Sequence, residues 1–169
     1  SKHSLKHTLS PSMDIMVSSN FERLLFDLYD RDGDAIRRLM DEFKSGAMTL
    51  DESALSKARE LFSSYKLDDK ETLATINELF ETCEYLVDPP TSVSIRAARA
   101  TRRRQDIPMI CLATAHPAKF PEAVRQAGQE TDPQLPHHMN DLFEREERFE
   151  VLPHDLKAVQ AFIAQRIRA

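Results

Sequence analysis

Glycine is scarce in this chain of 169 residues, which contains only Gly33, Gly46 and Gly128. Loops that cradle phosphate groups use glycine, because a backbone without Cβ lets its N–H groups approach the phosphate oxygens closely. Neither of the usual glycine-rich phosphate-binding spacings, GxGxxG or GxxxxGK[ST], occurs. If this chain contacts a phosphate, we expect the main phosphate cradle to lie elsewhere.

Cysteine and long apolar runs are also scarce. Cys83 and Cys111 are far apart and form no CxxC pair, which argues against a disulfide framework and a zinc site. The longest apolar run, Met109–Ala115, is much shorter than the ~20 residues that span a bilayer. The chain opens without a signal-like segment, and its net charge of −5 argues against nucleic acid as the main partner. We expect a cytoplasmic protein that contacts neither membrane nor nucleic acid.

The composition that remains, 41% hydrophobic and 30% charged, is typical of a globular domain. Proline and serine without helical periodicity predict an extended segment over residues 1–18. Residues 19–84 have apolar side chains at helical spacing between polar connectors, which predicts a helical subdomain. Residues 85–169 combine helical patterns with short branched runs, which predicts an α/β portion.

Three capping-box spacings mark expected helix starts in the helical subdomain: Ser19 with Glu22, Thr49 with Glu52, and Asp68 with Glu71. A further helix is expected from Pro90 towards Arg103, because proline suits the first turn of a helix. Shorter helices are expected over 122–127 and 137–147. A last helix over 155–168 should bury its apolar residues: Leu156, Val159, Phe162, Ile163 and Ile167.

Two short runs are the strand candidates. Ile107–Leu112 is apolar and contains branched residues, and Arg148–Leu152 is a weaker second case. The sequence therefore predicts a mostly α-helical chain with one or two short strands.

Several charged clusters have ordinary explanations. Asp27–Gly33 resembles a calcium loop, but Leu28 and Leu39 stand where acidic ligands are required, so an acidic interhelical turn is preferred. The histidines lack a ligand pattern and are read as surface residues: His3, His7, His137 and His138. No metal site is predicted. A basic cluster, Arg96, Arg99 and Arg102–Arg104, is read as a solvated face that pairs with acidic neighbours such as Glu144–Glu147, with an anion or subunit contact as the alternative.

Thr114–Lys119 is the strongest local candidate for a site. A hydroxyl, the imidazole of His116 and an ammonium follow an expected strand within six positions. Ligands gather at the carboxyl ends of strands in α/β sheets. An ordinary turn in which Thr114 or His116 caps the next helix explains the same residues equally well.

Two unusual strings carry a resemblance to a known family. TLSPSMDI at 8–15 runs into SSNFER at 18–23, and LATAHPAKF occupies 112–120; Tyr85–Ala98 adds weaker support. These strings resemble the C-terminal part of the long-chain threonine synthases, which use pyridoxal phosphate (PLP) to convert O-phospho-L-homoserine and water to L-threonine and phosphate. The resemblance implies a fold-type II (tryptophan-synthase-like) α/β fold and a lyase of threonine biosynthesis.

The resemblance also implies roles for individual residues. Thr114 would face the pyridine nitrogen of PLP with a neutral hydroxyl, leaving that nitrogen largely unprotonated. Ala113, Ala115 and His116 would line the same edge of the cofactor. The substrate cleft would include Ser12, Asp14, Ser19, Asn20, Arg23 and Lys119.

The chain departs from the family pattern at two points. Pro90 and Ser94 stand where the family usually has histidine and glycine. The Schiff-base lysine and the glycine-rich phosphate loop, which are N-terminal in the family, are missing, so this chain alone is expected to be inactive without the N-terminal PLP domain. The alternatives are a catalytically incomplete binding or structural module, and a related PLP phospho-lyase that adds no water.

Overall fold

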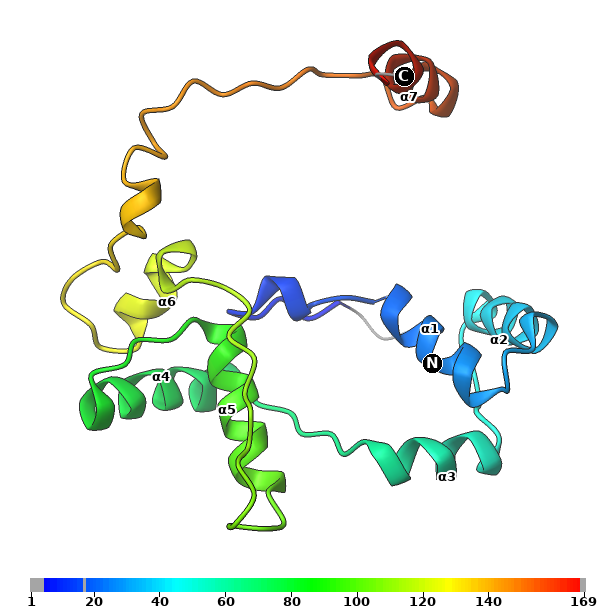
Figure 1. The fold of residues 1–169 in the computed structure, drawn as a ribbon, viewed down its shortest axis with the longest axis horizontal. Coiled ribbons are helices and arrows are strands. Elements are labelled where there is room, and N and C mark those ends of the chain that lie inside the picture. Colours follow the sequence, from blue (N-terminus) through cyan, green and yellow to red (C-terminus); the bar gives the residue numbers. More distant parts are fainter. Residues whose placement is uncertain (1–4, 17, 168–169) are drawn as a thin grey trace. The chain divides into compact units, whose positions relative to one another are not determined.

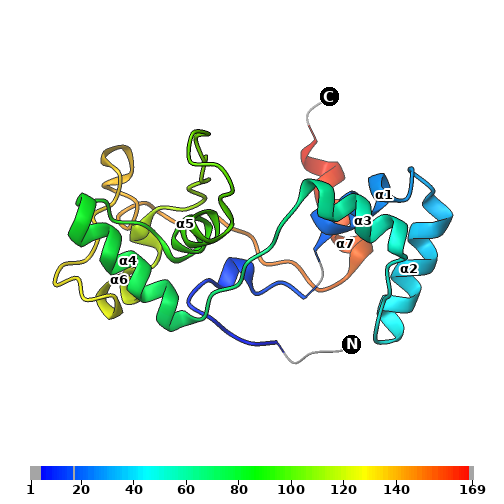
Figure 2. The same cartoon turned by 90° about the horizontal axis from the view of Figure 1, so that it is seen from below.

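A computed structural model describes residues 5–16 and 18–167. Two compact units are present, Ser1–Gln134 and Leu135–Ala169. Figures 1 and 2 show the course of the chain. The division at residues 18, 84 and 85 expected from the sequence stays a prediction, and each compact unit is described by itself.

The first unit opens with a 3₁₀ turn, η1 (Pro11–Met13), and three α-helices: α1 (Ser19–Leu28), α2 (Gly33–Ser45) and α3 (Glu52–Leu61). Helix α1 contacts both α2 and α3. The apolar stripes of these helices meet in a small core: Leu25, Leu28, Ile36, Leu39 and Ala54. This core confirms the helical periodicity of the segment.

Side-chain caps fix where these helices begin. The Asp68–Glu71 capping box at the next helix is confirmed, with both reciprocal hydrogen bonds present. The other two predicted caps were wrong by one or two residues: Ser18, instead of Ser19, caps α1, and Asp51, instead of Thr49, caps α3. The reason is local geometry, since a cap must stand in extended backbone with its oxygen near the N–H three residues on.

The second group of helices in this unit comprises α4 (Asp69–Cys83), α5 (Pro89–Thr101), η2 (Pro117–Lys119) and α6 (Pro121–Gln126). Helix α4 contacts α5 and α6, and the three lie side by side in Figures 1 and 2. Their core consists of Ile76, Leu79, Val87 and Ala127. Leu9 N–H donates to Asp69 Oδ1 (3.1 Å), which ties the N-terminal segment to the start of α4.

The expected strand at Ile107–Leu112 was wrong: no strand occurs among residues 5–16 and 18–167. The run is irregular, and its branched side chains lie in solvent, with Ile110 84% and Leu112 71% exposed. A strand needs a neighbour to receive its backbone hydrogen bonds. The described part of the chain supplies no such neighbour for this run.

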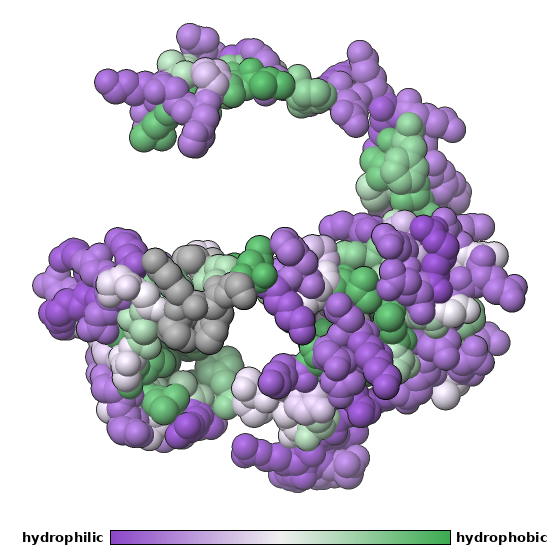
Figure 3. Space-filling view, turned by 180° about the vertical axis from the view of Figure 1, so that it is seen from behind, coloured by the Kyte–Doolittle hydropathy of each residue, from purple (hydrophilic) through white to green (hydrophobic). Residues whose placement is uncertain are grey.

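The second unit contains η3 (His137–Met139) and α7 (Leu156–Arg166). The predicted helix over 137–147 shrinks to η3 and turns, and the predicted strand at Arg148–Leu152 is absent from this described stretch. Helix α7 agrees with the prediction within two residues, although Arg168 lies outside the described residues. Its expected burial was wrong, because Leu156, Ile163 and Ile167 are all exposed, and Figure 3 shows apolar residues at the surface of the segment that contains α7. A unit of so few residues has no core to receive them.

Candidate functional site

The largest cavity described in the first unit has a volume of about 810 Å³. Four segments form its walls: the η1 turn, the linker between α3 and α4, the first turns of α5, and the stretch that leads into η2. The lining residues are Pro11, Ser12, Met13, Ser63, Ser64, Tyr65, Pro90, Val93, Ser94, Ala97, Leu112, Thr114, Ala115, Lys119 and Phe120. Segments far apart in the sequence thus meet around one hollow.

The stretch Leu112–His116 divides its side chains between two cavities. Leu112 and Thr114 line the large cavity, whereas Ala113 and His116 line a second one of about 410 Å³. Ala115 borders both. The neighbouring residues Ala113 and Thr114 therefore face different cavities. Of the four residues expected to line the cofactor, the structure places Thr114 and Ala115 at the large cavity.

His116 has a local structural partner. The Ala118 N–H donates to His116 Nδ1 (3.2 Å), so the imidazole caps the η2 turn. Because Nδ1 accepts, the neutral ring carries its proton on Nε2. The capping explanation of this residue is therefore present in the structure, and Nε2 is the atom left for any ligand.

The η1 segment brings Ser12 to the large cavity and holds Asp14 in a separate, smaller one. Asp14 accepts two hydrogen bonds from Thr8, one from the backbone N–H and one from the hydroxyl, each 2.8 Å. These donors, the backbone N–H first, lower the pKa of the Asp14 carboxyl. Asp14 therefore helps to fold the loop that presents Ser12.

The three substrate-cleft candidates on α1 do not reach this cavity. Ser19, Asn20 and Arg23 are exposed on the first turns of α1, and none of them lines the large cavity. The nearby cap is Ser18, whose hydroxyl accepts from the Phe21 N–H at 3.4 Å. The structure thus gathers Ser12, Thr114 and Lys119 and leaves the α1 residues apart.

Sequence reasoning missed the linker residues Ser63, Ser64 and Tyr65, which form one wall of the cavity. They lie between two helices without apolar periodicity, so no pattern distinguished them from an ordinary connector. Pro90 and Ser94, the two departures from the family pattern, line the same cavity. Both replacements therefore change the lining directly.

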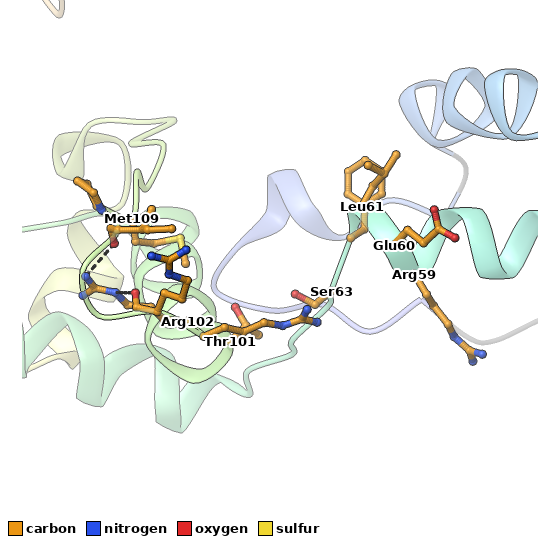
Figure 4. A pocket seen from close by; sticks show the side chains of 12 residues that line it. Arg59, Glu60, Leu61, Ser63, Thr101, Arg102 and Met109 are labelled. Carbon is orange, nitrogen blue, oxygen red and sulfur yellow. Dashed lines mark hydrogen bonds between the residues drawn. The ribbon is translucent and has the colours of Figure 1, made fainter.

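A smaller cavity of about 320 Å³ is lined by three arginines of the predicted basic cluster, Arg102, Arg103 and Arg104 (Figure 4). Figure 4 shows Thr101, Arg102 and Met109 on one side of it and Arg59, Glu60 and Leu61 on the other. The Arg102 guanidinium donates to three backbone carbonyl oxygens, those of Arg104, Gln105 and Ile107. This guanidinium is therefore occupied in closing its own loop.

Other arginines of the basic cluster pair locally. Arg99 pairs with Glu78 at 2.8 Å, and Arg104 pairs with Asp106, instead of the Glu144–Glu147 run suggested from the sequence. The bond to Asp106 raises the pKa of Arg104 and lowers that of Asp106. Helix α5 presents Arg99 to its neighbour α4, and sequence distance alone did not reveal that pairing.

The acidic turn after α1 also has structural roles. Asp30 pairs with Lys57 at 3.0 Å, and Asp32 caps α2. Over residues 5–16 and 18–167, no three histidine, cysteine or acidic side chains are grouped so that they could hold a metal. In the same described ranges, no helix has the length and apolar character needed to cross a bilayer.

The large cavity is chemically suited to a small aromatic cofactor that bears a ring nitrogen. Val93, Ala97 and Ala115 offer apolar surface, and the exposed Thr114 hydroxyl offers a neutral hydrogen-bonding group. Of the lysines in the part of the chain that the structure describes, only Lys119 lines this cavity. The residues present therefore fit one wall of a PLP site.

Comparison with known proteins gives a consistent result. A family model for the C-terminal part of threonine synthase matches residues 91–163. Threonine synthase from Pseudomonas aeruginosa is 53% identical over 165 residues, which cover 97% of this chain and 35% of that protein. Threonine synthase from Schizosaccharomyces pombe is 39% identical over 138 residues, which cover 73% of this chain and 27% of that protein.

Solved structures agree with these relatives. The crystal structure of PLP-bound threonine synthase from Brucella melitensis superposes with a TM-score of 0.83 at 44% identity, over 99% of this chain and 36% of that one. Yeast threonine synthase gives a TM-score of 0.78 at 30% identity, over 97% of this chain and 37% of that one. The chain spans about a third of the length of the relatives that it matches.

Proposed function

We propose, on the premise that this chain belongs to the threonine synthase family as its C-terminal region, that it forms one wall of a PLP-dependent active site. The complete protein would convert O-phospho-L-homoserine and water to L-threonine and phosphate, as a carbon–oxygen lyase acting on a phosphate ester. The observation that carries the proposal is the cavity in which the family string around Thr114 meets the N-terminal family string at Ser12.

This chain would hold the cofactor edge and exclude water there. The Thr114 hydroxyl would face the ring nitrogen and keep it largely unprotonated, and Ala115 would flank the ring. Ala113 and His116, which line the second cavity, would belong to the same edge of the site from that side. PLP, when bound, supplies an electron sink for proton removal from carbon. With a neutral hydroxyl partner the ring nitrogen stays unprotonated and the ring withdraws electrons less strongly, whereas a carboxylate would keep the nitrogen protonated.

The remaining predicted residues would form the substrate side. Ser12 and Lys119 line the cavity and can donate hydrogen bonds to an anionic substrate. Asp14 would act indirectly, by holding the η1 loop through Thr8. Ser19, Asn20 and Arg23 would approach the substrate from α1 in the complete protein, near a helix start suited to anions.

The Schiff-base lysine and the main phosphate cradle would come from an N-terminal PLP domain, which is the expected partner of this chain. The chain alone is therefore proposed to be inactive, and the complete enzyme to work in the cytoplasm. The chain matches only about a third of the length of its relatives, which supports a division of the active site between this chain and an N-terminal domain.

The proposal is tested by incubating the complete protein with O-phospho-L-homoserine and measuring phosphate and threonine. Equal amounts of both products are expected. Intact mass after addition of PLP and borohydride reduction gives a second test: the complete protein should carry one phosphopyridoxyl group, and this chain alone should stay at 19.4 kDa. A complete protein that releases no phosphate would overturn the proposal.

One observation favours a second candidate. Pro90 and Ser94, the two departures from the family pattern, line the same cavity as Thr114. A related phospho-lyase, or a module without chemistry, would tolerate an altered lining. The reaction products distinguish the three candidates: a threonine synthase forms threonine, a related phospho-lyase forms a 2-oxo acid, and a module without chemistry forms neither.

A further inference from the structure

We propose that the linker residues Ser63, Ser64 and Tyr65, together with Lys119, bind the phosphate group of the substrate. The inference rests on the proposed function and assigns to that site a segment that no sequence motif identified. The linker joins α3 to α4, and all four residues line the 810 Å³ cavity with Thr114. A phosphate monoester is the ligand class that their chemistry fits.

Uncommitted hydroxyls are the first argument. Six hydroxyl groups line the cavity, and none of them is hydrogen bonded to another group in the described part of the protein; they belong to Ser12, Ser63, Ser64, Tyr65, Ser94 and Thr114. Some other hydroxyls of this unit already donate to backbone carbonyls, as Thr72 does to Asp68, Thr75 to Glu71 and Ser92 to Pro89. The cavity therefore concentrates donors that have no protein acceptor among the described residues.

Charge is the second argument. Among the described residues, Lys119 is the only charged residue in the lining, and none of the described lining residues carries a carboxylate. Two carboxylates line the adjacent smaller cavity: Asp14 accepts both of its hydrogen bonds from Thr8, and Asp69 accepts one from the Leu9 N–H. One ammonium among hydroxyls suits an anion with several acceptor oxygens, because each oxygen accepts more than one donor.

The linker backbone is the third argument. Residues 63–67 belong to no helix, and within the described chain their backbone N–H groups donate to no backbone carbonyl. Both ends are fixed, by α3 at Leu61 and by the capped start of α4 at Asp68. Tyr65 borders both the large cavity and the one that contains Asp14, so it stands between the η1 loop and the site. The N–H groups of the linker that reach the cavity are therefore free of backbone partners among the described residues and can donate to an anion.

The substrate and the cofactor each carry a phosphate monoester, and the structure favours the substrate. The cofactor's phosphate requires close backbone approach, for which glycine is suited. None of the three glycines of this chain lines the cavity. The linker and Lys119 are therefore assigned to the substrate's phosphate, and the glycine-rich cradle of the N-terminal domain to that of the cofactor.

The test uses the complete protein with the triple variant Ser63→Ala, Ser64→Ala, Tyr65→Phe and the separate variant Lys119→Gln. The control is Ser56→Ala, an exposed serine on α3 that lines none of the described cavities. Three quantities are measured: KM for O-phosphohomoserine, the Kd of inorganic phosphate by calorimetry, and the Kd of PLP. Melting temperature reports whether each variant folds.

The triple variant and Lys119→Gln should each raise KM and the phosphate Kd about tenfold or more, because a hydrogen bond to a charged group contributes at least that factor. The PLP Kd and the control should stay unchanged. Unchanged phosphate affinity in folded variants would overturn the inference. Weaker PLP binding with an unchanged KM would also overturn it, because that result would assign the linker to the cofactor's phosphate. If the wild-type protein releases no phosphate from the substrate, the proposed function fails, and calorimetry with inorganic phosphate still decides the linker's role.

Discussion

Thr114 is the residue on which the proposed cofactor contact depends. Thr114 lines the large cavity, together with its sequence neighbours Leu112 and Ala115. Replacing it with valine keeps the shape and removes the hydrogen-bonding group. We expect Thr114→Val in the complete protein to lower kcat about tenfold or more, since one lost polar contact to the reacting system has at least that effect.

PLP content and absorbance of Thr114→Val should be measured beside kcat. Thr82→Val is the matched control, because Thr82 is exposed near the end of α4 and its hydroxyl donates to the Glu78 carbonyl (2.7 Å). Equal activity of the two variants would contradict the assignment of Thr114.

The lowered pKa of Asp14 predicts how the stability of the protein depends on pH. Its folded-state pKa is lowered by the Thr8 hydrogen bonds, so its contribution to stability is present above its ordinary pKa of 3.8 and is lost as the pH falls through the lower folded value. The wild-type protein should therefore be more stable than Asp14→Ala at neutral pH, and this advantage should disappear in strong acid. Urea unfolding at a series of pH values measures it, and a difference that does not change with pH would refute the role.

Element boundaries in this chain depend on caps, and helix α5 shows this best. Asp88 is only 1% exposed, and its carboxylate accepts from the Thr91 N–H (3.1 Å) and from the Thr91 hydroxyl. It therefore fixes the start of the helix that carries Pro90, Val93 and Ser94 into the cavity wall.

Asp88→Ala should lower the free energy of unfolding by about 2 kcal/mol, the upper range for a lost N-cap. Asp51→Ala, which removes the exposed cap of α3, is the comparison and should cost less. Chemical denaturation followed by circular dichroism measures both. A larger loss in Asp51→Ala would contradict the view that burial strengthens the Asp88 cap.

The elements also show the limits of sequence patterns. Helical periodicity and the Asp68–Glu71 box predicted α4 correctly, because each depends only on residues within a few positions. The strands expected at Ile107–Leu112 and Arg148–Leu152 were wrong, because pairing requires a second segment that the described chain does not provide.

Exposed apolar residues characterise the molecule as a whole. Phe143 is 84% exposed, and large apolar side chains are also exposed in both units: Leu61, Phe62, Ile110, Leu112, Phe149, Val151 and Leu156. Phe143, Phe149 and Val151 lie within nine positions of one another, and apolar residues exposed so close together are typical of a region that another domain covers. It agrees with a chain that spans about a third of its relatives' length.

The isolated chain should therefore self-associate and bind a hydrophobic dye, and the complete protein should do so much less. Light scattering and dye fluorescence at equal molar concentration measure this difference. The double variant Phe143→Ser, Phe149→Ser should reduce association of the isolated chain, with Ser53→Ala as an exposed control. A monomeric isolated chain without dye binding would contradict the prediction.

The sequence by itself determined the family, through the strings around Ser12 and Thr114, and most of the helices, because both depend on residues that are neighbours along the chain. Only the tertiary structure decided which candidates meet. It brought Ser12, Thr114 and Lys119 to one cavity, left the α1 residues apart, and added Ser63–Tyr65. The physical reason is that a cavity is formed by segments distant in sequence, and their meeting depends on how the helices pack.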